Sequence, residues 1–535
     1  MAVIDPRAAA RALASWRTHF PHASVRPEQE TMIEHARAVW SSGQKHVVLD
    51  AGTGCGKSAV AVCITRCVSS AGLGTATVLT SQRILQEQYE RSYPACSSVW
   101  SSSHYPCGHE RGLTCGQGKR LAVYMQSGAP MRGCDGCPYA AAREKFSASS
   151  AGVANYAYHL ACSAYAPDSL PDRSLFVYDE AHNIERELSA FSGVRSTLKE
   201  QNKLACKTLV GCPSVSKARA WLQSELKPAL EREIEKLRAS AAAAVRHGRS
   251  LRSIAPRLDA ADRTVCAVNR ILEKDPSNLV VHGDAESLQI TPLDVSDIGR
   301  EMLFGDERIT LSMSATIVDP VEWSRSSGAE CSSRDFVHAP CPFPVANRRI
   351  VYSPVGKMSS RDIDATIPLL VDAVSRVLEK HPNEKGIVHA GSFKVARAIF
   401  EGCKSDRLLM HKQGGEERSH TLERHALSEK PTVLLTPSMI EGIDLIDDLS
   451  RFQVIAKVPF ANLGDPLVLA RKRACDRWYK LEAARCLMQA HGRSVRSADD
   501  WAVTYVFDSC FGDFIAQNSD LFSYEFIEAI EVQSS

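Results

Sequence analysis

The sequence predicts an α/β protein with two domains, each built around a parallel β-sheet. Short apolar runs alternate with amphipathic helical stretches along most of the chain, which is the pattern of strands joined by crossover helices. One such strand, residues 46–50, runs into a glycine-rich loop and then into an apolar helical stretch. The length of 535 residues corresponds to about three to five domains, so it leaves room for insertions as well.

The composition excludes disordered and fibrous proteins, because 44% of the residues are hydrophobic, 24% charged and 7% aromatic. The net charge of +2 says little about partners, since a basic face can be balanced elsewhere on the surface. No apolar run reaches the roughly 18 residues that cross a bilayer. Asp5, Arg7 and Arg11 interrupt the place where a signal peptide needs its apolar core. We therefore expect a protein that is not secreted and has no membrane partner.

The strand at residues 46–50 leads into Ala51-Gly-Thr-Gly-Cys-Gly-Lys-Ser58, and a helical stretch follows. In a loop of this kind the backbone N–H groups cradle phosphates, the lysine reaches the β- and γ-phosphates, and the hydroxyl ligates Mg²⁺. We expect Lys57 and Ser58 in the last two roles. The remaining predicted nucleotide contacts of the loop are Gly52, Thr53, Gly54 and Gly56.

A second predicted strand, residues 175–178, ends in Asp179-Glu-Ala-His182. Two carboxylates at the end of a buried strand are costly to desolvate unless they serve a cation. Beside a phosphate loop that cation is Mg²⁺, with Asp179 as its ligand and Glu180 orienting or deprotonating the attacking water. Taken alone, the four residues could also be an acidic turn that caps a helix.

Eighteen cysteines are many for this composition, and five of them lie between Cys96 and Cys137. Four of these five have a neighbouring glycine or proline, which lets the backbone curl around a metal. They are Cys107, Cys115, Cys134 and Cys137. Zinc and a [4Fe–4S] cluster both fit four thiolates, and the spacing alone slightly favours zinc. A disulfide pair is disfavoured because no secretory signal is present. The other fourteen cysteines are predicted to be small apolar residues.

Further motifs follow one another along the chain. They are Arg26-Pro-Glu-Gln29, Thr80-Ser-Gln-Arg-Ile-Leu-Gln-Glu-Gln88, Leu311-Ser-Met-Ser-Ala-Thr-Ile317, Cys341-Pro-Phe-Pro, Gly386-Ile-Val-His-Ala-Gly-Ser-Phe393, Glu441-Gly-Ile-Asp-Leu445 and Gln489-Ala-His-Gly-Arg-Ser-Val-Arg496. With these motifs the chain resembles the superfamily-two helicases, and within them the iron–sulfur family of XPD and DinG. The resemblance implies two RecA-like motor domains. It also implies that Gln29 reads adenine and that Asp444 belongs to the site for ATP and Mg²⁺.

The resemblance changes the metal prediction. The cysteines fall between the phosphate loop and D-E-A-H, where this family inserts its [4Fe–4S] domain. Tyr105-Pro-Cys107 and Cys134-Asp-Gly-Cys-Pro-Tyr139 look like the family's flanks of its first and last ligands. The resemblance therefore implies an iron–sulfur cluster held by the four cysteines named above, which serves as a structural staple.

The resemblance also implies a division of the chain into four parts. These are motor domain 1, discontinuous over residues 1–95, 150–190 and 305–338; an iron–sulfur cluster domain over 96–149; a helical arch-like domain over 191–304; and motor domain 2 over 339–535. From Ser214 to Arg270 the third part has twelve Lys or Arg against six Asp or Glu. This basic excess indicates either DNA contact or a solvated helical face.

Hydrolysis requires groups that stabilise charge on the transferring γ-phosphoryl. Arg493 and Arg496 are three residues apart, so they would project from one face of a helix. They could serve this role from the facing domain when the cleft is closed, although any such pair could also lie on a surface helix. Gln489 begins the same motif and is assigned to catalysis with them. ATP binding would close the cleft, and hydrolysis would open it.

The resemblance implies an ATP-dependent DNA helicase that moves 5′ to 3′ on single-stranded DNA. We expect it to unwind forked duplexes or DNA–RNA hybrids as a monomer, in the cytoplasm of a bacterial or phage-like setting or at the nucleoid. An alternative is a nucleic-acid-dependent ATPase that binds or remodels DNA without unwinding it. A zinc-stapled motor is a further alternative. Tyr105, Tyr139, Tyr156 and Phe393 could stack on bases or could equally be core residues.

Overall fold

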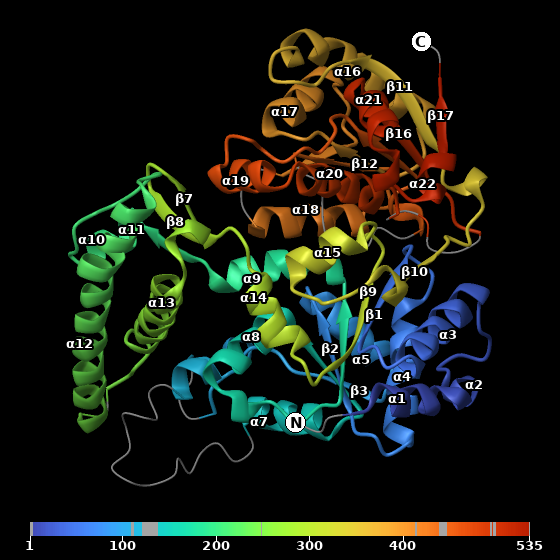
Figure 1. Cartoon of the computed structure of the whole chain (residues 1–535). Helices are drawn as coiled ribbons and strands as arrows, with labels where there is room; N and C mark the ends of the chain where they lie inside the picture. The colour runs from blue at the N-terminus through green and yellow to red at the C-terminus, as the bar shows by residue number, and fades with distance from the viewer. Residues whose placement is uncertain are drawn as a thin grey trace.

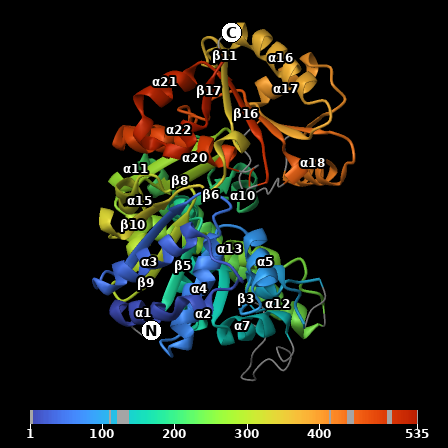
Figure 2. The ribbon, with the colours of Figure 1, turned by 90° about the vertical axis from the view of Figure 1, so that its right-hand side faces the viewer.

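A computed structural model describes residues 4–108, 112–119, 137–247, 249–411, 415–437, 447–492, 495 and 499–533. Two seven-stranded parallel sheets stand at the centres of two α/β domains, which confirms the predicted fold class (Figure 1). The two sheets are stacked one above the other in Figures 1 and 2, and a third part, mostly helical, projects to the left in Figure 1.

The first sheet is assembled from distant parts of the chain. Its strands, in spatial order, are β10 (Phe336–Ala339), β1 (His46–Ala51), β9 (Ile309–Ser314), β5 (Leu175–Asp179), β2 (Ala76–Thr80), β4 (Ala151–Asn155) and β3 (Cys96–Ser98). All pairings are parallel, so the carboxyl ends of the strands meet at one edge. Strands β5 and β9 are buried throughout. Strand β5 is accordingly apolar up to Asp179, whereas β9 alternates apolar residues with Thr310, Ser312 and Ser314.

Helices cover both faces of the first sheet, because successive strand side chains point to opposite faces. Val47 and Leu49 pack into one core, and Val48 between them packs into the other. The first core holds α1 (Pro6–Ala12), α2 (Trp16–His19), α3 (Pro27–Ser41), α4 (Lys57–Ser70) and α5 (Arg83–Ser92), and the second holds α7 (Pro138–Ala148), α8 (Tyr156–Tyr165), α9 (Ile184–Ser192), α14 (Ser296–Gly299) and α15 (Pro320–Ser327). Strand β3 lies in this sheet, although the sequence assigned its residues to the cluster domain.

The insertion expected to be helical contains a small sheet as well. Its helices are α10 (Leu198–Lys203), α11 (Val215–Trp221), α12 (Lys227–Arg246) and α13 (Ala255–Glu273), and its antiparallel strands are β6 (Val194–Thr197), β8 (Ser287–Pro292) and β7 (Leu279–Asp284). The helices follow from amphipathic spacing, which α12 shows by burying Leu230, Ile234 and Leu237. The strands mix polar with apolar residues, so they do not stand out in the sequence as the apolar runs of β1 and β5 do.

The second sheet is drawn wholly from the second half of the chain. Its strands, in spatial order, are β13 (Leu408–Met410), β14 (Val433–Thr436), β12 (Gly386–His389), β15 (Phe452–Ile455), β16 (Val503–Asp508), β11 (Ile350–Gly356) and β17 (Ile530–Val532). Its helices are α16 (Ile363–Lys380), α17 (Phe393–Gly402), α18 (Gly415–Leu427), α19 (Pro466–Ala474), α20 (Asp476–His491), α21 (Cys510–Gln517) and α22 (Tyr524–Glu528). All the described pairings are again parallel.

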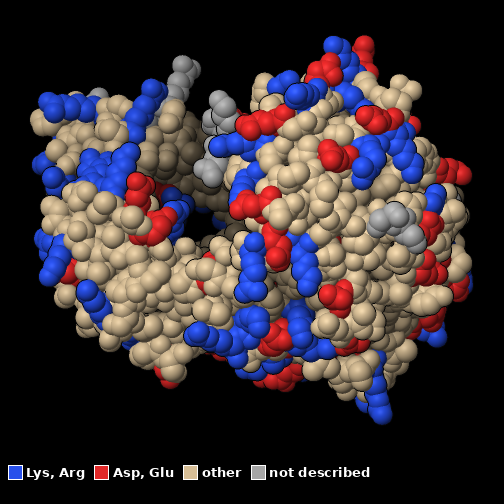
Figure 3. All heavy atoms as spheres, turned by 90° about the horizontal axis from the view of Figure 1, so that it is seen from above, with Lys and Arg blue, Asp and Glu red and all other residues tan. Residues whose placement is uncertain are grey.

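Seen from above, the insertion forms a lobe that a deep hollow separates from the body, and Lys and Arg side chains stand on both sides of the hollow (Figure 3). The small sheet of this lobe also reaches the second domain. His282 Nδ1 on β7 lies 3.9 Å from Asp465 Oδ1, and Asp465 caps the start of α19. The lobe therefore touches both α/β domains.

Candidate active site between the two sheets

The glycine-rich loop joins β1 to α4 at the carboxyl edge of the first sheet. Gly56 has a φ of 83°, a left-handed conformation that glycine adopts without strain, and Lys57 begins the helix. The Lys57 Nζ donates hydrogen bonds to the carbonyl oxygens of Ala51 at 2.7 Å and Gly52 at 3.2 Å. The amides at the start of α4 and this ammonium group form a place for an anion such as a phosphate.

The predicted adenine-reading segment lies directly against this loop. Arg26 Nη1 donates to the Gly54 carbonyl oxygen at 2.7 Å, and Gln29 Oε1 accepts from the Arg26 amide at 3.0 Å. A side chain at position 56 would overlap the amide of Gln29, which is buried. Glycine at position 56 therefore serves close packing as well as the turn.

The two acidic residues of D-E-A-H stand where β5 ends. The Tyr89 hydroxyl, which also interacts with Ser58, donates to Asp179 Oδ2 at 3.0 Å, so both predicted Mg²⁺ ligands lie close together. Burial and the neighbouring Glu180 charge raise the pKa of Asp179 to about 6, against the opposing effect of Lys57. Glu180 has a φ of 51°, a strained conformation for a residue other than glycine. The buried Asp179 carboxylate with its raised pKa suits a bound cation.

Residues of the second domain contact D-E-A-H and S-A-T directly. The Gln489 amide nitrogen on α20 lies 2.6 Å from His182 Nε2 and donates to Thr316 Oγ1 at 3.2 Å. On the same helix, Arg485 Nε donates to the Thr316 carbonyl oxygen at 3.0 Å. His182 Nδ1 in turn lies 2.7 Å from Ser314 Oγ. Helix α20 of the second domain thus contacts two motifs of the first domain.

A second set of contacts crosses the interface beside this one. Arg471 Nη1 lies 3.2 Å from Glu185 Oε1, and Trp478 Nε1 donates to Glu185 Oε2 at 3.0 Å. Burial raises the pKa of Glu185, although Arg471 opposes that shift. These contacts join α9, which follows D-E-A-H, to α19 and α20.

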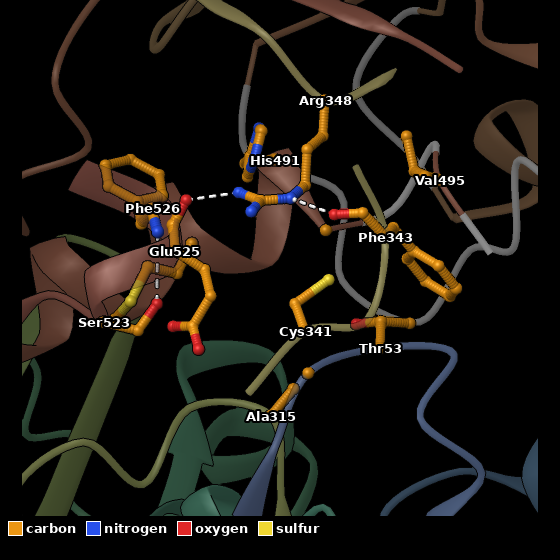
Figure 4. Close-up of a pocket in the computed structure, with 13 residues that line it drawn as sticks. Thr53, Ala315, Cys341, Phe343, Arg348, His491, Val495, Ser523, Glu525 and Phe526 are labelled. Carbon is orange, nitrogen blue, oxygen red and sulfur yellow. Dashed lines mark hydrogen bonds between the residues drawn. The ribbon is translucent and has the colours of Figure 1, made fainter. Parts of the chain in front are cut away.

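A cavity of about 80 Å³ opens between the domains beside the glycine-rich loop (Figure 4). Residues of both domains line it, among them Thr53 and Ala315 from the first and Arg348, His491 and Glu525 from the second. Arg348 Nε donates to the Phe343 carbonyl oxygen at 3.1 Å, and its Nη1 donates to the Glu525 carbonyl oxygen. The loop therefore faces the second domain across an interdomain cavity.

Several predicted site residues lie outside the described residues. They are Asp444, Arg493, Arg496 and Cys134. Gly492 and Val495 of the same motif are described, and both line the cavity beside the glycine-rich loop. The roles assigned to all the site residues remain predictions.

Three of the four predicted cluster cysteines are described. Cys115 Sγ and Cys137 Sγ lie 3.9 Å apart, and the Cys107 thiol lies so close to Gly118 that a Cβ there would overlap it. Burial raises the pKa of Cys115 to about 12. The pKa of Cys137 lies below its ordinary value, because amides at the start of α7 outweigh its partial burial. This donor set fits a thiolate-bound metal, although no group of three or more metal-ligating side chains is assembled within the described part of the chain.

The cysteine segment contacts the helical insertion. Leu113 is buried in the core that α11, α12 and α13 share, and Cys107 packs against that core.

The aromatic residues predicted to stack on bases differ in burial: Tyr139 and Tyr156 are buried, whereas Phe393 is 38% exposed. Two of these aromatic rings are therefore core residues.

Sequence reasoning did not assign Asp50, Tyr89 or Arg485. Asp50 is buried just before the glycine-rich loop. A carboxylate at the end of an otherwise apolar strand is the sequence feature that could have identified it as a site residue. Tyr89 lies on helix α5, and Arg485 lies on helix α20, most of whose residues are buried. Nothing in their local sequence separates them from packing residues.

Comparison with known families matches both domains. The model "Type III restriction enzyme, res subunit" matches residues 22–211, and the model "Helicase C-terminal domain" matches residues 374–522. The ATP-dependent DNA helicase DinG of Photobacterium profundum is 27% identical over 259 residues, 45% of this chain and 36% of that protein. The ATP-dependent DNA helicase YoaA of Escherichia coli is 23% identical over 235 residues, 42% of this chain and 36% of that protein. The matched segment thus spans about a third of each relative.

Solved structures show the same fold. An XPD helicase superposes with a TM-score of 0.66 at 13% identity, covering 96% of this chain and all of that one. Xpd4 of S. tokodaii superposes with a TM-score of 0.57 at 14% identity, covering 95% of this chain and 99% of that one. Among the described helices, none combines the length and apolar character that crossing a membrane requires. In its two matched family models and in relatives that align with nearly half of it, the chain is thus similar to the DinG-like superfamily-two helicases, and it shares the fold of the XPD structures.

Proposed function

We propose that the protein is an ATP-dependent DNA helicase in which ATP is hydrolysed between the two α/β domains. The observation that carries the proposal is the contact of Gln489 with both His182 and Thr316. It joins the second domain to the two motifs next to the predicted γ-phosphate site. A change in the nucleotide there alters how the domains sit against each other, which is what a translocating motor needs.

The chain's own residues supply binding and proton transfer. The amides of residues 52–56 and the Lys57 ammonium bind the phosphates, and Gln29 contacts the base from the other side of the loop. Ser58 and Asp179 would hold Mg²⁺, which neutralises phosphate charge when bound. Glu180 positions the attacking water and accepts its proton. Arg493 and Arg496 stabilise the transferring group, with Gln489 and Asp444 completing the site.

The same proposal covers the substrate and the division of the chain. Single-stranded DNA passes the hollow beside the lobe, and the protein moves along it 5′ to 3′, which opens a forked duplex or a DNA–RNA hybrid. The basic sides of that hollow support this path (Figure 3). The four-part division given above, a monomeric state and a place of action in the cytoplasm or at the nucleoid belong to the proposal.

A [4Fe–4S] cluster held by Cys107, Cys115, Cys134 and Cys137 is the proposed metal group. It would rigidify the segment that packs on the helical lobe, and the 3.9 Å approach of Cys115 and Cys137 supports it. Anaerobic purification followed by iron, sulfide and zinc analysis tests it. About four irons per chain and a broad visible absorbance are expected. A colourless sample that contains zinc would instead show that the cysteines hold zinc.

Strand separation on a 5′-tailed fork, measured beside ATPase activity on single strands, tests the function. We expect both activities, and a 3′-tailed fork should remain paired. ATPase without strand separation would contradict the helicase proposal and point to a remodelling ATPase. The Cys137→Ser variant should lose unwinding and keep ATPase, while Cys212→Ser, at an exposed cysteine of the lobe, is the matched control.

A further inference from the structure

Three charged side chains join the two domains at the point where the chain passes between them. Asp50 lies on β1, His338 on the neighbouring β10, and Glu525 on α22 of the second domain. His338 Nδ1 lies 3.4 Å from Asp50 Oδ2, and His338 Nε2 lies 3.1 and 3.2 Å from the two carboxylate oxygens of Glu525. The Glu525 carboxylate points toward the first domain (Figure 4). An imidazolium can donate to both acids at once.

Asp50 also holds the turn that follows S-A-T. Its two carboxylate oxygens accept hydrogen bonds from the amides of Ile317 at 3.1 Å and Val318 at 3.3 Å. Val318 has a φ of 58°, and a β-branched residue adopts this conformation only under strain. Such a conformation is energetically costly and persists only when its surroundings hold it. The shape of this turn therefore depends on the Asp50 carboxylate.

The strand register places His338 at a hinge. Asp50 and His338 are direct partners in the β1–β10 ladder. Strand β10 ends at Ala339, and the next strand, β11, already belongs to the second sheet. A change in the angle between the domains must therefore act close to His338, next to the strand that leads into the glycine-rich loop.

The charges at this point favour a protonated His338. The side chains of Asp50 and Glu525 are 4% and 11% exposed, and that of His338 is 36% exposed. Partial burial lowers the pKa of His338, but the two facing carboxylates outweigh it and raise the pKa to about 10. The same contact holds the pKa of Glu525 at about 2 despite its burial. These two acids are the charged groups that the neighbouring elements β1 and α22 turn toward the ring.

We propose that His338 is a positioning residue that transmits the position of the second domain to the S-A-T turn through Asp50. When α22 moves with the second domain, Glu525 pulls on the imidazolium, and the carboxylate that holds Ile317 and Val318 shifts with it. The S-A-T turn lies against Gln489 and hence against D-E-A-H. His338 thus links domain movement to the catalytic acids without touching the nucleotide. This inference rests on the proposed ATPase motor.

Four variants separate charge from packing. His338→Gln removes the positive charge, His338→Lys keeps it, and Glu525→Gln removes the partner in the second domain. Arg349→Gln breaks the Arg349–Glu531 pair, with N–O distances of 2.8 and 2.6 Å, which lies on the outside of the second domain and serves as the matched control. Each variant is assayed for ATP turnover with and without a saturating DNA single strand.

We expect His338→Gln and Glu525→Gln to lower the DNA stimulation of ATP turnover about fivefold, with KM for ATP changed by less than about twofold. A fifth variant that combines His338→Gln with Glu525→Gln should be no worse than either single one, because both substitutions break one relay. His338→Lys should recover most of the stimulation, and Arg349→Gln should behave as the parent. A merely structural role would lower the thermal midpoint without changing the stimulation ratio. Parent-like stimulation in His338→Gln would overturn the proposal.

Hydrogen exchange of residues 311–320 tests the relay without any activity. The amides of Ile317 and Val318 should exchange faster in His338→Gln than in the parent and in Arg349→Gln, because Asp50 holds them less firmly. Unchanged exchange would overturn the inference. If the parent itself has no DNA-stimulated turnover, the proposed function is wrong, and the exchange result still decides whether His338 positions the turn.

Discussion

The two parallel sheets of this protein have the same number of strands but carry different side chains at their facing edges. In the first domain, Lys57 follows strand β1, and Asp179 and Glu180 stand at the end of strand β5. These two strands flank β9, which leads into S-A-T. Among the described residues, those that the second domain presents there include Arg485, Gln489 and Glu525, which contact S-A-T, D-E-A-H and strand β10 of the first domain.

This difference separates the residues proposed to bind the nucleotide, on the first domain, from those proposed to respond to it, on the second. Groups that contact a nucleotide must sit at fixed distances from one another, and a single rigid sheet provides that. Groups that detect the nucleotide must move relative to it, so they belong on the other domain. Each prediction below tests one side of this division.

The largest effect is expected from Lys57→Ala. Removing the ammonium group leaves the phosphates without their main protein cation, so turnover of ATP should fall by at least about a hundredfold. Phosphate release at saturating DNA measures it. Lys199→Ala on α10, an exposed position, is the control. Retained turnover would mean that the first sheet does not hold the nucleotide.

Gln489→Ala tests the second sheet. The variant breaks the contacts to His182 and Thr316, so turnover and unwinding should fall about tenfold while the binding of a non-hydrolysable ATP analogue stays nearly unchanged. Steady-state kinetics and nucleotide titration measure the two effects. The exposed Gln517→Ala of α21 is the control. A loss of nucleotide affinity instead of turnover would place Gln489 among the binding groups.

Leu113→Ala tests the lobe, which is an insertion into the first domain. Leu113 is 4% exposed in the core of the lobe, and its truncation should cost about 2–4 kcal/mol of local stability. Unwinding should fall more than ATP turnover does, and proteolysis of the cysteine segment should speed up. The 76% exposed Leu427→Ala should change neither. Equal loss of both activities would show that the lobe supports the catalytic site itself.

The smallest effect concerns acid stability. Burial lowers the pKa of His159 in the first domain and of His491 in the second to about 3. Because both stay neutral when folded, the unfolded chain binds more protons below its pKa of about 6.5, and stability falls as the pH drops from there toward 3. His159→Gln should flatten this fall by up to about 1.4 kcal/mol per pH unit, measured as the thermal midpoint from pH 8 to 5. An equal slope in His159→Gln, or a flattened one in the exposed control His247→Gln, would contradict the assignment.

Local sequence patterns were enough to predict the strand, loop and helix that are proposed to bind phosphate. The apolar run before Ala51 and the helical spacing after Lys57 specify a strand and a helix, and the loop between them needs left-handed glycine at Gly56. The strand before Asp179 was equally clear. The short strands of the lobe were missed, because they mix polar with apolar residues and lack the apolar run that marks β1 and β5.

The sequence by itself therefore determined two α/β domains, the glycine-rich loop and the acidic strand end, since each depends on neighbouring residues. Only the tertiary structure decided that Asp50, His338 and Glu525 meet, and that Gln489 reaches His182 from 307 residues away. The physical reason lies in the strand order, β10-β1-β9-β5, which makes neighbours of segments that no local pattern connects. Parallel pairing then brings their carboxyl ends to one edge, where the second domain meets them.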